Sequence, residues 1–240
     1  MCDRCLPHSA FSYLANPAAV SIPGEAAAPE SYEERRPLLI HLTVTGRCYA
    51  RCVGCVNAAV TLGLDTDRHR LLTAAETVPE RDARAVIHLA SQSPCQEVVL
   101  CFYGGEPLLA ADKIARVIHL LDASVLRGRL RYMLITNGEL LLKTMSAHPG
   151  LIERLWLIGV SVDGRAEQHN RVRRGTDLHI IHANLEALRA VRRGQVLMWS
   201  TLRECQSLLD CFLEFLEARD RGWVEHFFWH WAEGREAFAD

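Results

Sequence analysis

The feature that most constrains this chain is a group of three closely spaced cysteines directly after an apolar run. Cys48, Cys52 and Cys55 form a C-x3-C-x2-C pattern, and the apolar residues Leu38–Thr45 before them predict a β-strand. Three thiolates on one loop suit an iron–sulfur cluster that is short of one ligand. A cube of four irons held by three local cysteines leaves one iron open to an external ligand. The pattern therefore predicts a strand followed by a loop at which chemistry takes place.

Length and composition indicate one globular domain with a sizeable core. The chain has 240 residues, about half of them apolar, and a formal net charge of −2. This near-neutral balance disfavours nucleic acid as a partner. No apolar run approaches the ~20 residues that cross a bilayer, and the N-terminus lacks a secretory signal. Nine cysteines, grouped as cluster ligands rather than as a disulfide framework, favour a reducing cytoplasm.

Strand-like and helix-like segments alternate along the chain. Residues 38–45, 97–103, 132–136, 155–162, 195–201 and 223–230 predict six strands. Helical spacing appears in three apolar stripes, namely Ala83/Val86/Ile87/Ala90, Ile114/Val117/Ile118/Leu121 and Leu208/Phe212/Phe215/Leu216. This alternation predicts parallel strands joined by right-handed crossovers. Periodicity alone leaves an incomplete barrel and an open doubly wound sheet as alternatives.

Further motifs follow the predicted strands in order. They are Tyr-Gly-Gly-Glu-Pro at 103–107, Ile-Thr-Asn-Gly at 135–138, Ser-Val-Asp-Gly at 161–164 and His-Asn-Arg-Val-Arg at 169–173. Together with the cysteine loop, these motifs resemble the radical S-adenosylmethionine (radical SAM) superfamily, and in particular the core domain of SPASM-type peptide and protein maturases such as sulfatase-maturing enzymes. The resemblance implies an α/β fold, a partial (β/α)6 barrel of the TIM type, with the working residues at the C-terminal ends of the strands.

The resemblance also assigns cofactors and site residues. It implies a [4Fe–4S] cluster on the three cysteines and SAM chelated to the open iron through its amino and carboxylate groups. The residues that it places around SAM are Gly104, Gly105, Glu106, Pro107, Asn137, Ser161, Asp163 and Arg173. Glu106 is expected to bind the SAM ammonium, Arg173 its carboxylate, and the segment Ser161–Asp163 the ribose. The alternatives are turn or capping roles, which for Asn137 carry equal weight.

Some positions depart from the family pattern or stand apart from it. The family usually has an aromatic residue before the third cysteine, where this chain has Gly54. His169 matches a frequent family position, but a structural hydrogen bond is favoured over catalysis. Cys2 and Cys5 are interpreted as free thiols on an arm, residues 1–37, that is expected to be partly disordered, with the core domain at 38–240. The chain has no cysteine-rich C-terminal extension, so it is either a minimal core enzyme or a truncated one.

The predicted function is the reductive cleavage of SAM to methionine and a 5′-deoxyadenosyl radical that abstracts hydrogen from a substrate. A peptide or protein side chain is the leading substrate class, and a small-molecule cofactor precursor is the alternative. A hypothesis from another class is a non-catalytic scaffold that binds metal, such as zinc, through the same cysteines. The expected electron donor is a flavodoxin or ferredoxin. No residue is identified as the group that acts on substrate, because the radical chemistry belongs to the cofactor.

Overall fold

The computed structural model describes residues 36–55 and 76–232. Almost all of the predicted arm 1–37, including Cys2 and Cys5, lies outside the described residues. Within them the chain forms six strands: β1 (Leu38–Thr45), β2 (Val98–Gly104), β3 (Leu130–Thr136), β4 (Leu155–Ser161), β5 (Gln195–Leu202) and β6 (His226–Trp231). The helices are α3 (Pro79–Gln92), the 3-10 turn η2 (Pro107–Ala110), α4 (Ala111–Asp122), α5 (Leu141–Ala147), α6 (Pro149–Arg154), α7 (Ala166–Val172), α8 (Leu178–Val191) and α9 (Leu208–Asp220).

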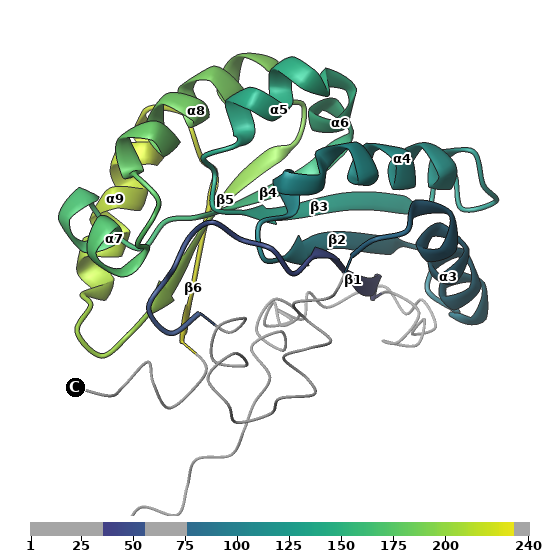
Figure 1. Cartoon of the computed structure of the whole chain (residues 1–240), viewed down its shortest axis with the longest axis horizontal. Coiled ribbons are helices and arrows are strands. Elements are labelled where there is room, and N and C mark those ends of the chain that lie inside the picture. The colour runs from purple at the N-terminus through teal and green to yellow at the C-terminus, as the bar shows by residue number, and fades with distance from the viewer. Residues whose placement is uncertain (1–35, 56–75, 233–240) are drawn as a thin grey trace, which may run out of the picture.

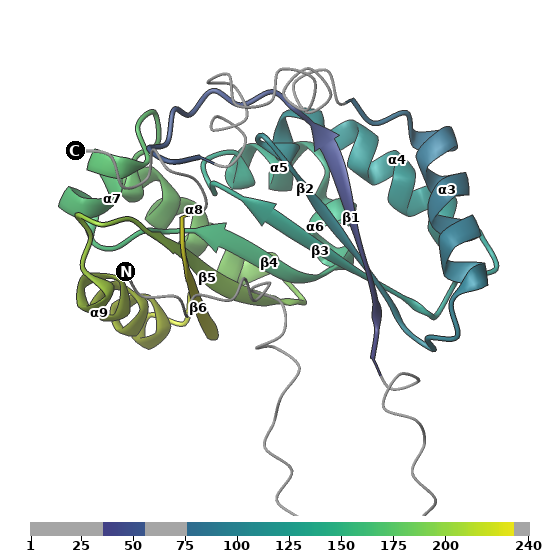
Figure 2. The ribbon, with the colours of Figure 1, turned by 90° about the horizontal axis from the view of Figure 1, so that it is seen from below.

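The six strands form one parallel sheet in the order β1-β2-β3-β4-β5-β6. Each strand pairs with its neighbour in the chain, and the helices lie as an arc over one face of the sheet (Figure 1). Figure 2 shows that the strands run in the same direction through a twisted sheet. Within the described residues β1 and β6 do not pair, so the sheet is open. The predicted partial (β/α)6 barrel is confirmed.

The main core lies between the sheet and its helices. Val98, Leu100 and Phe102 alternate along β2 and are fully buried, as are Val117 and Leu121 on α4. Six of the seven residues of β2 are buried, so this strand lies in the interior of the sheet. The apolar strand segment and the helical stripe in the sequence therefore predicted the core at this position.

Helix α9 differs from the sequence prediction. Its buried residues are Cys211, Glu214, Phe215 and Ala218, whereas Phe212 is 42% exposed. The buried face includes Glu214, whose carboxylate lies 2.6 Å from His182 Nε2 of α8.

Strand β6 divides its aromatic residues between the two faces of the sheet. Phe227 stacks on Phe215 of α9, with ring centroids 5.2 Å apart, so it faces the helices. Phe228 points to the opposite face because side chains alternate along a strand. There it packs against Trp199 of β5, with centroids 4.5 Å apart. No helix among the described residues is long and apolar enough to cross a membrane.

Candidate active site

The sequence motifs meet at one edge of the sheet. The cysteine loop follows β1, the Gly-Gly-Glu-Pro motif follows β2, Asn137 follows β3 and Asp163 follows β4. Because all strands are parallel, their C-terminal ends share an edge, and the four segments come together there. The arrangement agrees with the expectation that working residues lie at the C-terminal ends of the strands.

The cysteine loop is attached to the end of α7 by its backbone. The N–H of Arg51 donates to the carbonyl of Arg174 at 2.7 Å, and the N–H of Val53 donates to the carbonyl of Val172 at 2.8 Å. Gly54 has a φ of 60°, in the left-handed region that favours glycine. The backbone of this turn therefore explains why glycine replaces the aromatic residue that the family usually has here.

The two glycines of the Gly-Gly-Glu-Pro motif allow the cysteine loop to approach closely. A Cβ on Gly105 would lie 2.2 Å from the carbonyl oxygen of Arg47, and one on Gly104 would lie 2.4 Å from that of Thr45. The N–H of Gly105 donates to Thr45 at 2.8 Å. The glycines thus make room for the chain that enters the cysteine loop, whereas the sequence prediction had them make room for a ligand.

Glu106 is fully buried and engaged by the protein itself. Its Oε1 accepts hydrogen bonds from the N–H of Leu108 at 3.0 Å and from the hydroxyl of Thr136 at 2.8 Å, and its Oε2 accepts one from the N–H of Asn137 at 2.8 Å. Burial raises the pKa of Glu106 to about 7, despite these donors. The carboxylate caps η2, whose first residue is Pro107, and joins the ends of β2 and β3. The carboxylate is enclosed by these donors, and its predicted contact with the SAM ammonium stays a prediction.

Asn137 carries an unsatisfied donor. Its Oδ1 accepts from the hydroxyl of Tyr49 at 2.9 Å and from the N–H of Glu139 at 3.1 Å. Its Nδ2 is buried and is, among the side chains that the structure describes, the one buried polar atom without a hydrogen-bond partner. A buried donor without a partner is costly, so a ligand that accepts a hydrogen bond here would relieve the cost.

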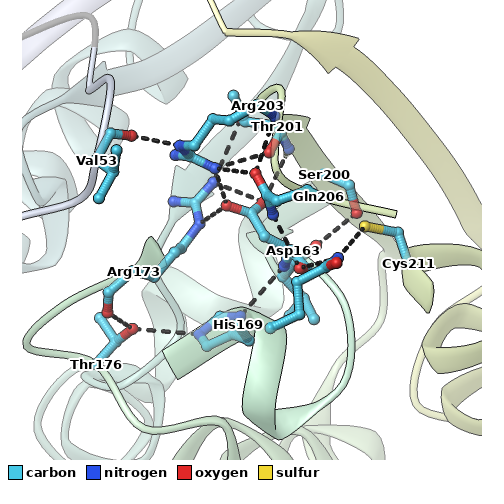
Figure 3. A network of polar contacts seen from close by, with 12 residues as sticks. Val53, Asp163, His169, Arg173, Thr176, Ser200, Thr201, Arg203, Gln206 and Cys211 are labelled. Atoms are coloured by element: carbon cyan, nitrogen blue, oxygen red, sulfur yellow. Dashed lines mark hydrogen bonds and ion pairs between the residues drawn. The ribbon is translucent and has the colours of Figure 1, made fainter. Parts of the chain in front are cut away.

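Asp163 is the centre of a buried ionic network (Figure 3). Its carboxylate accepts from Arg173 Nε at 2.7 Å, from Arg203 Nη1 at 2.8 Å and from the N–H of Thr201 at 2.8 Å. Burial alone would raise the pKa of Asp163, but the two guanidinium groups hold it below its usual value. The sequence prediction had Asp163 and Arg173 facing a cofactor. The structure pairs them with each other, and Ser161, the last residue of β4, is buried nearby.

Arg203 was not among the site residues predicted from the sequence. It is the largest fully buried side chain among the described residues, and it contacts both Asp163 and the carbonyl of Val53 in the cysteine loop. The available signal was its place directly after β5, at the same strand edge as the recognised motifs. No local pattern marked it, because Asp163 and Val53 lie 40 and 150 residues away in sequence.

His169 has a structural role in this network, as favoured from the sequence. Its Nδ1 accepts from the N–H of Asp163 at 3.2 Å, so its proton lies on Nε2, which faces the hydroxyl of Thr176 at 3.2 Å. That hydroxyl donates in turn to the carbonyl of Arg173 at 2.7 Å. Burial, followed by the charge of Arg173, lowers the pKa of His169 to about 3. The imidazole is therefore neutral at physiological pH.

The three loop cysteines fit an iron–sulfur cluster in donor type and surroundings. All are free thiols. Partial burial raises the pKa of Cys48 to about 11, and the charges of Glu106, Cys52 and Cys55 raise it further. The N–H of Ala50 donates to the Cys48 sulfur.

The same thiols are not gathered tightly around one point. Among the described residues no group of three His, Cys, Asp or Glu side chains is placed to hold a single metal ion. A cluster does not require such convergence, because each thiolate binds a different iron. The loop would hold the cluster through Cys48, Cys52 and Cys55, with positive charge supplied by Arg173 and Arg203.

Solved structures with SAM or peptide share this fold. The chain is similar to anSMEcpe with bound AdoMet and Kp18Cys peptide (TM-score 0.65, 19% identity, 83% of this chain and 52% of that chain). It is also similar to Streptococcus suis SuiB bound to precursor peptide SuiA (TM-score 0.57, 12% identity, 93% of this chain and 49% of that chain). The chain thus spans about half the length of these proteins, and at these identities the likeness shows the fold. The fold is that of the radical SAM core.

A family model identifies the chain more closely. The model described as "4Fe-4S single cluster domain" matches residues 38–180, from β1 into α8. This is more than half of the 240 residues, so the chain belongs to the 4Fe-4S single cluster domain family. No curated protein matches the chain.

Proposed function

We propose that this chain cleaves SAM reductively at a [4Fe–4S] cluster and uses the resulting radical to abstract hydrogen from a peptide or protein side chain. The observation that carries the proposal is the meeting of three free thiols with the ends of β2, β3 and β4 at one edge of a radical SAM sheet. The cluster, when bound, supplies the electron that breaks a carbon–sulfur bond of SAM. A flavodoxin or ferredoxin of the cytoplasm is the proposed source of that electron.

The protein's own groups have distinct parts in this proposal. Cys48, Cys52 and Cys55 hold the cluster, and Asn137 Nδ2 donates to a SAM acceptor group, because it is buried and has no protein partner. Gly104 and Gly105 hold the cysteine loop close to β2. The remaining SAM contacts proposed from the motifs are Glu106, Pro107, Ser161, Asp163 and Arg173.

Glu106 and Arg173 would need a rearrangement to contact SAM directly, because each is buried and already bonded. As observed, they shape the site. Glu106 joins β2 to β3, and Arg173 supplies positive charge on the side of Cys52.

A peptide substrate is favoured over a small molecule by two observations. Similar solved structures, anSMEcpe and SuiB, contain a peptide in addition to sharing the fold. The described sheet is open between β1 and β6, and its helix-free face carries Trp199, Phe228 and His230, whose rings lie 4.5–5.9 Å apart. An aromatic surface of this kind suits the apolar and aromatic side chains of a peptide.

Anaerobic reconstitution with iron and sulfide tests the reaction. We expect about four irons per chain, a charge-transfer absorption band, and 5′-deoxyadenosine after addition of dithionite and SAM. The matched control is Cys52→Ala, which should lose the cluster and the product but keep its circular dichroism. A chain that retains zinc and takes up no iron would instead be the metal-binding scaffold.

The substrate class is tested by coupling. Candidate peptides are added to the reconstituted protein, and 5′-deoxyadenosine is quantified together with the mass change of the peptide. Turnover that responds to a small metabolite and to no peptide would favour the small-molecule alternative.

A further inference from the structure

The Arg203 side chain joins three parts of the site. Its Nη1 donates to Asp163 at 2.8 Å, to the carbonyl of Thr201 at 2.8 Å and to Gln206 at 2.9 Å. Its Nε donates to the carbonyl of Val53. Figure 3 shows the guanidinium between Val53 on one side and Asp163 on the other. With only 2% of the side chain exposed, these bonds hold it in one orientation.

The bond to Val53 acts on the part of the loop that carries two cysteines. Val53 lies between Cys52 and Cys55, and its backbone is held from both sides. Its N–H donates to the carbonyl of Val172, while its carbonyl accepts from Arg203, which is 150 residues away in sequence. The guanidinium therefore fixes the cysteine loop relative to the end of β5.

The network also has an excess of positive charge. Arg173 and Arg203 share one carboxylate, that of Asp163, and His169 beside them is neutral. Arg203 contacts the carbonyl of Val53, the residue after Cys52, and Arg173 shares the Asp163 carboxylate with it, so both guanidinium groups lie beside the cysteine loop. Net charge and hydrogen bonding around cluster sulfurs set a cluster's reduction potential, and nearby positive charge raises it.

We propose that Arg203 is a positioning residue for the cysteine loop. Its guanidinium fixes the Val53 carbonyl and keeps positive charge beside the cluster. The part that concerns charge rests on the proposed function. The part that concerns the loop is a property of the chain itself. A lysine in its place would keep the charge, but its single ammonium lacks the fork that reaches Val53 and Asp163 together.

Hydrogen exchange on the cluster-free protein tests the positioning of the loop. We compare Arg203→Lys and Arg203→Gln with Arg192→Gln, a control that removes another largely buried, ion-paired arginine near the opposite end of β5. Loss of the bond to Val53 should raise the exchange rate of the Arg51 and Val53 amides roughly tenfold or more in both Arg203 variants. The control should leave these two amides at the wild-type rate.

The reduction potential of the reconstituted cluster separates charge from position. Arg203→Gln should give a more negative potential than wild type, and Arg203→Lys should restore it while exchange stays fast. If the Arg51 and Val53 amides of Arg203→Lys exchange at the wild-type rate, the positioning role is overturned. This comparison decides the point even if Arg203→Gln does not fold. An unchanged potential in Arg203→Gln would overturn the charge role. If the wild-type chain takes up no cluster, the proposed function fails, whereas the exchange result still decides the positioning role.

Discussion

The ionisable residues of the site are held mainly by one another. Glu106, Asp163, His169 and Arg173 are buried, and each has at least two hydrogen-bond partners within the protein. Breaking a buried polar network leaves groups without partners, which costs more than the lost bond itself. Substitutions of these residues should therefore affect stability as well as cofactor binding.

Glu106 provides the clearest case. Glu106→Ala leaves the N–H groups of Leu108 and Asn137 and the hydroxyl of Thr136 without their acceptor, so we expect a loss of at least about 2 kcal/mol of unfolding free energy. Glu106→Gln retains one oxygen and should lie between this variant and wild type. Urea unfolding measures the free energies of the three proteins and so checks this order.

The control for Glu106 is Glu80→Ala on the exposed face of α3, which should leave the unfolding free energy close to that of wild type. If Glu106→Ala unfolds like wild type and loses only SAM affinity, the carboxylate faces the cofactor and not the network described above.

His169 should make the protein sensitive to acid. Its pKa falls from an ordinary value of 6.5 to about 3 on folding, because of burial and then Arg173. The native state thus binds the proton more weakly than the unfolded state, so this contribution is present above pH 6.5 and is lost as pH falls towards 3. Urea unfolding between pH 7 and pH 4 should show a shallower decline in His169→Gln than in wild type. Parallel curves would contradict a buried neutral imidazole.

At the scale of elements, the cysteine loop takes its shape from the segments around it. It contacts the start of the Gly-Gly-Glu-Pro motif, the end of α7 and the residue after β5. A substitution in any of these segments should therefore displace the cysteines, although the cysteines themselves are unchanged.

Gly105→Ala tests this dependence. A Cβ would lie 2.2 Å from the carbonyl oxygen of Arg47, and backbone atoms cannot yield as a flexible side chain does. We expect iron uptake to fall severalfold, together with a loss of about 1–3 kcal/mol of stability. The control is Gly150→Ala in α6, where the added Cβ meets nothing within 4 Å. Normal iron uptake by Gly105→Ala would show that the close approach is not needed.

The six strands and the cysteine loop were predictable because their signals are local. Apolar runs mark each strand, and motif order marks the shared edge. The apolar stripe of α9 was predicted in part: Phe215 is buried and Leu216 packs against the core, whereas Phe212 is exposed and Glu214 is buried beside His182 of another helix. Arg203 and the inward orientation of Glu106 were missed for the same reason. Their partners lie in other elements, and no spacing within the sequence encodes such a contact.

At the scale of the whole molecule, the site is a set of loops rather than a closed cavity. Successive parallel strands each contribute one segment to the same edge, and the hydrogen bonds of the cysteine loop, of Glu106 and of the Asp163 network join these segments. A ligand that contacts several of them should stabilise the folded sheet as a unit, because it binds the native state alone.

Thermal unfolding should therefore respond to the proposed cofactors in order. The cluster should raise the Tm of the wild-type chain, and SAM at one hundred times its Kd should add about 2.7 kcal/mol of stability. Removing the cluster with a chelator should reverse both increments. Cys52→Ala should show neither shift, and a SAM-induced shift in that variant would mean that SAM binds independently of the cluster.

The bond between Val53 and Arg203 also sets an order in time. The loop follows β1, but its anchor emerges 150 residues later, which at usual rates of synthesis takes roughly 8 to 30 s. Because the strands are in chain order, the sheet can grow as each one appears, while the loop waits for β5. The part of the site that is translated first is thus completed late, and cluster insertion belongs to the end of folding rather than to its beginning.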